Sequence, residues 1–205
     1  MLRLLAADLR PAFEALFQVD AAMGDVVARA TQPALGAVKL VWWRERLEEL
    51  DQGIVPAEPR LRAVTQHLLP QGIRGADLAL LEDGWATLFE TQVEPRRISN
   101  RGAALFRFGG RLLDADDEKL GDAGAIVALL GVGRRGLPGL LDRASDHERP
   151  LIRHRFPRRL RPLTALARLA VRDLRSGPPF EPEGTPPRVA AMLRHQWSGI
   201  VTRGD

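Results

Sequence analysis

Two aspartates in the first long amphipathic stretch are of the residue type that metal-assisted chemistry uses. Asp20 and Asp25 both fall in residues 11–30, where an initial proline and apolar residues at helical spacing predict a helix. Mg²⁺ prefers oxygen ligands in a tight geometry, and a helix presents two carboxylates on one face when they are at positions i and i+4. Asp20 and Asp25 are five residues apart, which separates them by about 140° around the helix axis. They are the first catalytic candidates if the protein is an enzyme, although their spacing disfavours a shared metal site.

The remaining acids and the histidines do not form a recognisable catalytic or metal-binding pattern. The acids at positions 114 to 118 precede an apolar helix, where the helix dipole favours negative charge, so we interpret them as a solvated turn. Glu82, Asp83 and Glu90 fall within a predicted helix and are interpreted as its solvent-exposed face. The four histidines lack metal-ligand spacing, and no metal site is predicted. These histidines are His67, His147, His154 and His195.

Arginine supplies all but two of the 30 basic residues, and its densest cluster lies in residues 149–175, where Asp173 is the only acid. Such a segment is most often a solvated face, but arginine also binds phosphate and carboxylate groups well, so an anionic lipid surface or an acidic partner is the alternative. Base stacking is disfavoured because tyrosine is absent and aromatic residues make up 5%, and no nucleic-acid partner is predicted. The basic patch is predicted at Arg153, Arg155, Arg158, Arg159 and Arg161.

Length and composition predict one globular domain over residues 1–205, since a chain with 45% hydrophobic residues can bury a full core. The absence of cysteine excludes disulfides, thiolate metal sites and a cysteine nucleophile. The first apolar run is short and soon meets Asp8, and no later segment reaches about 18 uninterrupted apolar residues. We therefore expect a cytoplasmic protein without a resident cofactor, with peripheral contact to a membrane as a further option.

The most strongly specified element is a helix over residues 33–51. Leu40, Trp43, Leu47 and Leu50 form one apolar stripe on it, and a second set of apolar residues widens the stripe. We therefore expect this helix to be buried on more than one side, with both tryptophans in the core. The second set is Leu35, Val38, Val41 and Trp42.

Apolar periodicity and proline or glycine boundaries predict an all-α bundle. Residues 119–132 are almost wholly apolar and should lie in its middle. Residues 145–162 and 176–187 are expected to be irregular. In the last helix, capped by Thr185, we expect Val189, Met192, Leu193, Trp197 and Ile200 to face inward. The further predicted helices span residues 60–69, 76–93, 97–113, 119–132, 137–143, 163–175 and 186–201.

The run RPAFEALFQVDAAMGDVVARATQPALGAVKLVWWRERLEELDQGIVPAEPRLRAV resembles the N-terminal part of the squalene/phytoene synthase family. The similarity rests on an Arg-Pro entry, an Ala-Leu-Phe-like helix with an acidic residue, a Pro-x-Leu-Gly turn, a Trp-Trp-Arg-Glu helix and a proline-bearing loop. Later pieces with a weaker likeness are RISNRGAALFRFGGRLL, GDAGAIVALLGVGRRG and RPLTALARLAVRDL.

The resemblance implies the all-α isoprenoid synthase fold, here shortened, and enzymes that join two isoprenoid diphosphates head to head. In this family two aspartate-rich helices hold Mg²⁺, and the metal binds diphosphate. Asp20 and Asp25 would then be the acids to test, and Arg44 would contact either diphosphate or a buried acid. The likeness is incomplete, because Asp122 is the only acid in the later motif and the chain has no tyrosine.

The family also contains non-catalytic branches, including an assembly factor for respiratory complex I that keeps the tryptophan-bearing helix and has lost the aspartate motifs. This chain is similar in that respect. The first hypothesis is therefore a non-catalytic binding or assembly helper, with a protein or an anionic membrane surface as partner. The alternative hypothesis is a Mg²⁺-dependent prenyltransferase whose ligand is an isoprenoid diphosphate.

Overall fold

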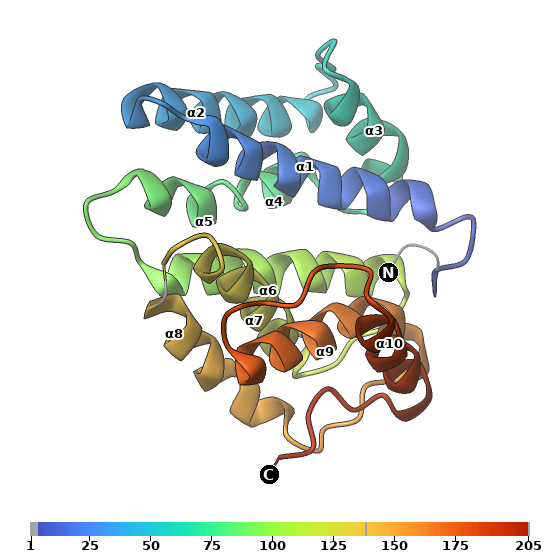
Figure 1. Ribbon diagram of the computed structural model, residues 1–205. Coiled ribbons are helices and arrows are strands. Elements are labelled where there is room, and N and C mark those ends of the chain that lie inside the picture. Colours follow the sequence, from blue (N-terminus) through green and yellow to red (C-terminus); the bar gives the residue numbers. More distant parts are fainter. Residues whose placement is uncertain (1–3, 138, 205) are drawn as a thin grey trace. The chain divides into compact units, whose positions relative to one another are not determined.

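The computed structural model describes residues 4–137 and 139–204, and helices are its regular elements (Figure 1). Within these residues no strand forms, and isolated bridges join Ile152 to Thr202 and Arg155 to Ile200. The all-α prediction is therefore confirmed. None of the helices in the described residues is long and apolar enough to cross a membrane.

The described chain forms two compact units, and the boundary between them along the chain falls in helix α6, Pro95–Leu112, between Arg101 and Gly102. The N-terminal unit holds residues 6–101, and the C-terminal unit holds residues from 102 onward together with residues 4 and 5. The expectation of a single domain stays a prediction. Besides the first part of α6, the N-terminal unit contains α1 Arg10–Arg29, α2 Pro33–Leu50, α3 Pro59–His67, α4 Gly75–Ala79 and α5 Asp83–Ala86.

Helix α2 is buried on one side only. It packs against α1 and α4, and Figure 1 shows α1 and α2 side by side. The predicted stripe of Leu40, Trp43, Leu47 and Leu50 is buried, as the sequence indicates. The expected second buried face is wrong, because Leu35, Val38 and Trp42 are 57%, 66% and 41% exposed. Within this unit the neighbouring helices cover only the first stripe.

The single helix expected over residues 76–93 is also wrong, since the segment is divided into α4, α5 and a 3₁₀ turn at Thr87–Phe89. At its start the backbone of Gly75 packs so closely on α2 that an added Cβ would lie 1.9 Å from the Leu47 carbonyl oxygen. At Gly84 an added Cβ would lie 2.5 Å from the Cβ of Arg101. These two close approaches hold the chain against different neighbours, and the helix is interrupted between them.

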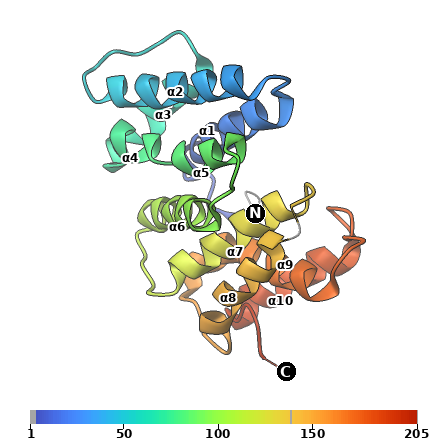
Figure 2. The same cartoon turned by 90° about the vertical axis from the view of Figure 1, so that its left-hand side faces the viewer.

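The C-terminal unit is built around an apolar central helix. Its elements are the second part of α6, α7 Leu120–Gly133, α8 Gly139–Glu148, α9 Arg161–Ser176 and α10 Pro186–Ser198. Helix α7 packs against α8 and α9 (Figure 2), and most of its side chains are buried, which confirms its predicted place in the middle. Helix α8 runs beyond the predicted 137–143 into the stretch that we expected to be irregular. Residue 138 lies outside the described residues.

Helix α10 is turned relative to the sequence prediction. Arg188, Ala191 and His195 are buried, whereas Val189, Leu193 and Trp197 are 46%, 51% and 87% exposed. The buried side is held by polar contacts: Arg188 pairs with Asp173, and His195 bonds to Thr164. These contacts with α9 involve the polar side of α10. The face of α10 that packs therefore differs from the one that its apolar periodicity predicts.

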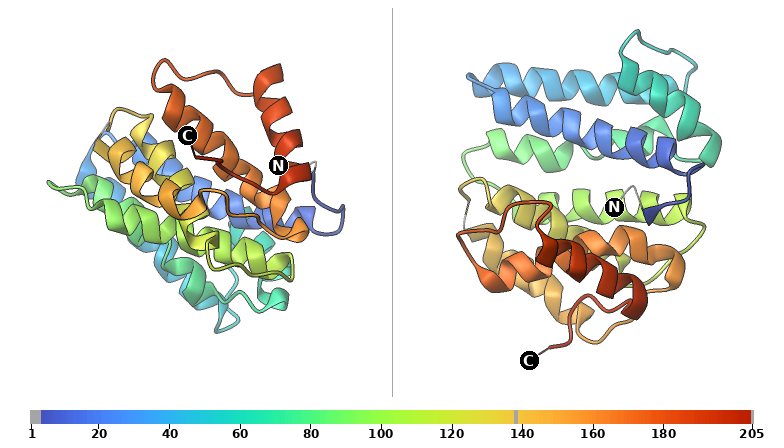
Figure 3. Two further views of the ribbon diagram at one scale, coloured as in Figure 1. Left: turned by 90° about the horizontal axis from the view of Figure 1, so that it is seen from below. Right: turned by 45° about the vertical axis from the view of Figure 1, so that its right-hand side comes forward.

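The segment that connects α9 to α10 is an extended connection over residues 177–185 (Figure 3). Thr185 occupies the N-cap position of α10, but its side chain makes no capping hydrogen bond. Its hydroxyl donates to the Glu181 carboxylate instead. The expected capping interaction is therefore wrong, although the helix begins where the sequence predicts.

Burial of His195 predicts a loss of stability in acid. Its Nδ1 lies 3.2 Å from the Ile200 carbonyl oxygen, and its Nε2 lies 2.8 Å from the Thr164 hydroxyl oxygen. Burial lowers the pKa of the imidazole to about 4, and Arg161 and Arg168 contribute in the same direction. Between pH 6.5 and 4, His195 is protonated in the unfolded chain and stays neutral in the folded chain. The free energy of unfolding should therefore fall by roughly 3 kcal/mol as the pH is lowered through this range.

Urea denaturation at a series of pH values checks this prediction. His195→Gln should remove that part of the pH dependence, whereas His67→Gln on α3 should keep it. Equal slopes in wild-type protein and His195→Gln between pH 6.5 and 4 would contradict a buried neutral imidazole.

Candidate functional site

Asp20 is occupied by contacts within the N-terminal unit. Its Oδ1 accepts from the indole Nε1–H of Trp85 at 2.9 Å, and its two oxygens lie 2.8 and 3.0 Å from Nη1 of Arg101. The same guanidinium stacks on the Trp85 ring, 3.7 Å from its centroid. A carboxylate held in this way links α1, α5 and α6 by charge-assisted hydrogen bonds. Its surroundings are those of a structural ion pair.

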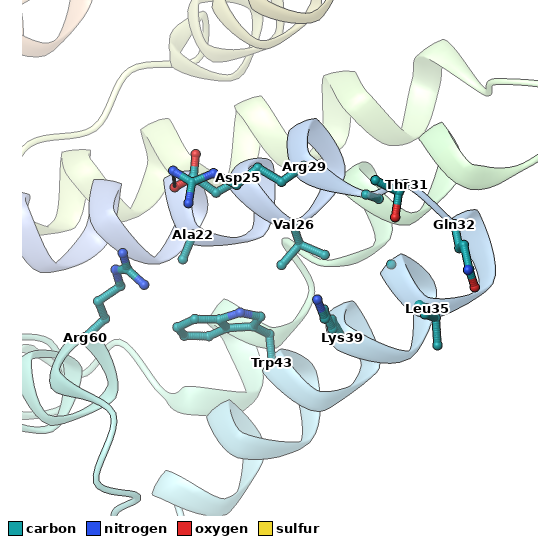
Figure 4. Close-up of a pocket in the computed structure, with 12 residues that line it drawn as sticks. Ala22, Asp25, Val26, Arg29, Thr31, Gln32, Leu35, Lys39, Trp43 and Arg60 are labelled. Carbon is teal, nitrogen blue, oxygen red and sulfur yellow. Dashed lines mark ion pairs between the residues drawn. The ribbon is translucent and has the colours of Figure 1, made fainter.

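Asp25 lies in a different environment, as its spacing predicts. It lines a surface pocket of about 310 Å³ between α1 and α2 and makes a solvent-exposed ion pair with Arg29 at 3.7 Å (Figure 4). Asp20 is absent from this lining. The structure therefore does not bring the two catalytic candidates into one site.

The pocket combines positive charge with a wall to which Trp43, an otherwise buried side chain, contributes. In Figure 4 the Trp43 ring lies between Lys39 of α2 and Arg60 of α3. Arg60 also contacts Glu58 at 3.4 Å, and the carboxylate of Glu58 caps α3. Cations beside an indole ring suit a ligand with an anionic group and an apolar part, whereas one carboxylate is too few to hold Mg²⁺ by itself. The lining is Ala22, Asp25, Val26, Arg29, Ala30, Thr31, Gln32, Leu35, Gly36, Lys39, Trp43 and Arg60.

Arg44, the candidate diphosphate-binding residue, faces a buried acid. Its Nη1 lies 3.8 Å from Oε2 of Glu82, and the Glu82 side chain is almost fully buried. Burial raises the pKa of the Glu82 carboxyl, and the charge of Arg44 opposes that shift. Glu82 was expected on a solvent-exposed face, and this expectation is wrong because the broken helix turns it inward. Arg44 thus contacts an acid, and its predicted contact with diphosphate stays a prediction.

The predicted basic patch is only partly a surface. Arg153, Arg155 and Arg158 are exposed, and Arg159 is exposed but pairs with Asp114 at 2.7 Å. Arg161 is buried, and its guanidinium donates to the carbonyls of Phe156, Gln196 and Trp197, so its assignment to the patch is wrong. Arg161 thus donates hydrogen bonds to carbonyls at the end of α10. Neither its place in the sequence nor its hydropathy indicates this role.

The acidic turn before α7 has a partner that the sequence did not indicate. His154 Nε2 lies 2.8 Å from Oδ1 of Asp117, and His147 Nδ1 lies 2.9 Å from Oδ1 of Asp122. Each of these contacts joins a histidine of the C-terminal unit to an aspartate. In residues 4–137 and 139–204 no group of three or more histidine, aspartate or glutamate side chains is placed to hold a metal ion.

Three residues with distinctive surroundings were missed by sequence reasoning. The sequence predicts Arg101 only as part of a helix, whereas its burial depends on Asp20 and Trp85, which are distant in the chain. Lys39 and Arg60 come together only through the packing of α2 on α3, and no local pattern indicates that pairing.

Comparisons of the chain with protein-family models, curated proteins and solved structures give no match. Membership of the squalene/phytoene synthase family therefore stays a prediction from the sequence motifs.

Proposed function

We propose that this protein is a squalene/phytoene synthase-like helper that binds a partner and does not condense prenyl diphosphates. The observation that carries the proposal is the set of contacts that Asp20 makes. Its carboxylate is bonded to Arg101 and Trp85, and Asp25 lies in a separate pocket. A metal-assisted condensation needs carboxylates that converge on Mg²⁺, and α1 provides no such pair.

The outer face of α2 is the surface on which the helper would bind a protein. Leu35, Val38 and Trp42 are exposed at positions i, i+3 and i+7 of one helix. This spacing is the one by which an amphipathic helix docks into an apolar groove of a partner protein. The proposed occupant is therefore a protein with such a groove, and Trp42 is the central anchor because large aromatic side chains contribute most at interfaces.

The second candidate function is a Mg²⁺-dependent prenyltransferase, and the pocket of Figure 4 is the observation that favours it. Asp25, Lys39 and Arg60 place both signs of charge beside the apolar surface of Trp43. A prenyl diphosphate has a matching anionic head and apolar chain. In this case Asp25 would contribute one metal ligand, and diphosphate oxygens would supply others.

Thermal-shift titration with farnesyl and geranylgeranyl diphosphate, each with and without Mg²⁺, separates these functions. Ligand that binds only the folded state raises the apparent melting temperature. The helper proposal predicts that Mg²⁺ adds no increase at saturating ligand. A Mg²⁺-dependent increase that Asp25→Ala abolishes, with Asp142→Ala on α8 as the control, would support the prenyltransferase instead.

A further inference from the structure

A second pocket, in the C-terminal unit, is lined by arginines, and none of the described residues in its lining is acidic. Its volume is about 250 Å³, and it lies where α9, the end of α10 and the segment after α10 meet. Arg168, Arg194 and Arg203 come from these three places. The full lining is Arg168, Arg175, Arg194, His195, Ser198, Ile200, Val201 and Arg203.

The positive charge of this pocket is not neutralised by the parts of the protein that the structure describes. Arg175 pairs with Glu148 at 2.7 Å, but no carboxylate of residues 4–137 or 139–204 forms an ion pair with Arg168, Arg194 or Arg203. Arg168 is half-buried and fixed by a 2.8 Å hydrogen bond from Nη1 to the Val201 carbonyl. Burial lowers the pKa of Arg168, and the neighbouring arginines lower it further by repulsion. An anion bound among these groups would relieve that repulsion.

An apolar surface adjoins the arginines. A shallow hollow next to the pocket shares Arg194, Ser198 and Arg203 with it and is lined also by Leu193 and Trp197. These two side chains belong to the outward face of α10, and Trp197 is the most exposed large apolar residue of the described chain. Charge and apolar surface thus meet along one edge of α10.

We propose that this surface, formed by Arg168, Arg194 and Arg203 with Leu193 and Trp197, binds the phosphate head groups of anionic phospholipids at a bilayer surface. Arginine forms paired hydrogen bonds with phosphate oxygens. Tryptophan and leucine side chains on an amphipathic helix insert at the boundary between head groups and acyl chains. The juxtaposition of both chemistries favours a lipid surface over a free anion, which would leave Trp197 in water.

This inference is independent of the proposed function. The phospholipid surface lies in the C-terminal unit, and the α2 surface lies in the N-terminal unit. Loss of one interaction therefore leaves the other measurable.

Flotation of the full chain with vesicles tests the proposal. Binding is expected to vesicles of phosphatidylcholine mixed with phosphatidylglycerol and not to phosphatidylcholine alone. Arg194→Gln combined with Arg203→Gln should weaken binding by about 10- to 30-fold, since each basic residue near an anionic membrane contributes about a factor of five. The matched control is Arg155→Gln with Arg158→Gln, which removes the same charge from exposed positions outside the pocket and should weaken binding less than 3-fold in a localised site.

Further measurements keep the outcome decisive. Vesicle binding should shift the tryptophan emission to shorter wavelength, and Trp197→Leu should remove most of the shift. Melting curves check that both double variants fold, which we expect because all four replaced arginines are exposed. Equal losses in the two double variants would mean diffuse charge attraction and overturn the proposal. Competition by inorganic phosphate at equal phosphate concentration would indicate a free-anion site, and binding of a polyglutamate peptide lost in the pocket variant would indicate an acidic protein; either result would overturn the lipid assignment.

Discussion

Replacing Asp20 by alanine should destabilise the protein by about 3 kcal/mol, because it leaves a charged guanidinium without its partner in the interior. The Arg101 side chain is 5% exposed and that of Asp20 is 15% exposed, so water cannot replace the lost carboxylate. The hydrogen bond of the Trp85 indole N–H is lost as well. Chemical denaturation of the purified variant measures the change in the free energy of unfolding.

The matched control is Asp25→Ala on the same helix. Its ion pair with Arg29 is exposed on both sides, and such pairs contribute at most about 0.5 kcal/mol. The double variant Asp20→Leu with Arg101→Met should recover much of the stability, since it removes the unpaired charge together with the carboxylate. A free energy of unfolding for Asp20→Ala within 0.5 kcal/mol of that for Asp25→Ala would contradict a structural role for Asp20.

Gly124→Ala should destabilise the C-terminal unit by about 3 kcal/mol, since it drives a methyl group into a backbone contact. Helices α6 and α7 approach so closely that a Cβ on Gly124 would lie 2.1 Å from the Gly102 carbonyl oxygen. A backbone atom cannot move aside as a flexible side chain can, so the two helices must separate and lose packing. Thermal and urea denaturation of the variant measure the effect.

Gly131→Ala provides a control within the same helix. A Cβ at Gly131 meets no atom within 4 Å, and the position is exposed. Alanine should stabilise the helix there by about 0.5 to 1 kcal/mol, because it restricts the unfolded backbone and has the higher helix propensity. Similar effects of the two substitutions would show that α6 and α7 do not cross at Gly102 and Gly124.

The helical class, one buried stripe of α2 and the central place of α7 followed from local pattern. The stripe at Leu40, Trp43, Leu47 and Leu50 is buried, and the apolar segment of α7 is central, because both depend on side-chain periodicity and burial of apolar area. Periodicity predicts which residues avoid water. It does not indicate how many sides of a helix find a neighbour, and for that reason the exposure of Trp42 was not predicted.

Helix α10 shows how a few polar contacts can overrule hydropathy. Arg188 and His195 would be assigned to the solvent face by any apolar pattern, yet Asp173 and Thr164 of α9 supply them with buried partners. Those partners lie in another helix, so the sequence of α10 contains no sign of them. The same applies to Glu82. Its burial depends on the interruption of the helix between α4 and α5, where the backbone at Gly75 and Gly84 packs closely on its neighbours.

For the candidate sites, the spacing of residues indicated which side chains share a helix face, but the sequence did not indicate the partner of each side chain. The five-residue separation of Asp20 and Asp25 correctly indicated that they do not share a face. The identity of each partner, Arg101 for Asp20 and Glu82 for Arg44, comes from contacts between residues far apart in the chain. The arginine pocket also joins distant segments: Arg168 and Arg175 belong to the predicted basic segment 149–175, whereas Arg194 and Arg203 lie outside it.

An assay of diphosphate release tests whether the protein binds a partner without condensing prenyl diphosphates, as expected if Asp20 serves the fold. Purified wild-type protein would be incubated with farnesyl or geranylgeranyl diphosphate and Mg²⁺, with Asp25→Ala as the matched variant. We predict release no faster than in the protein-free control for both proteins. Mg²⁺-dependent release by the wild-type protein that Asp25→Ala reduces would instead show that the protein is a prenyltransferase.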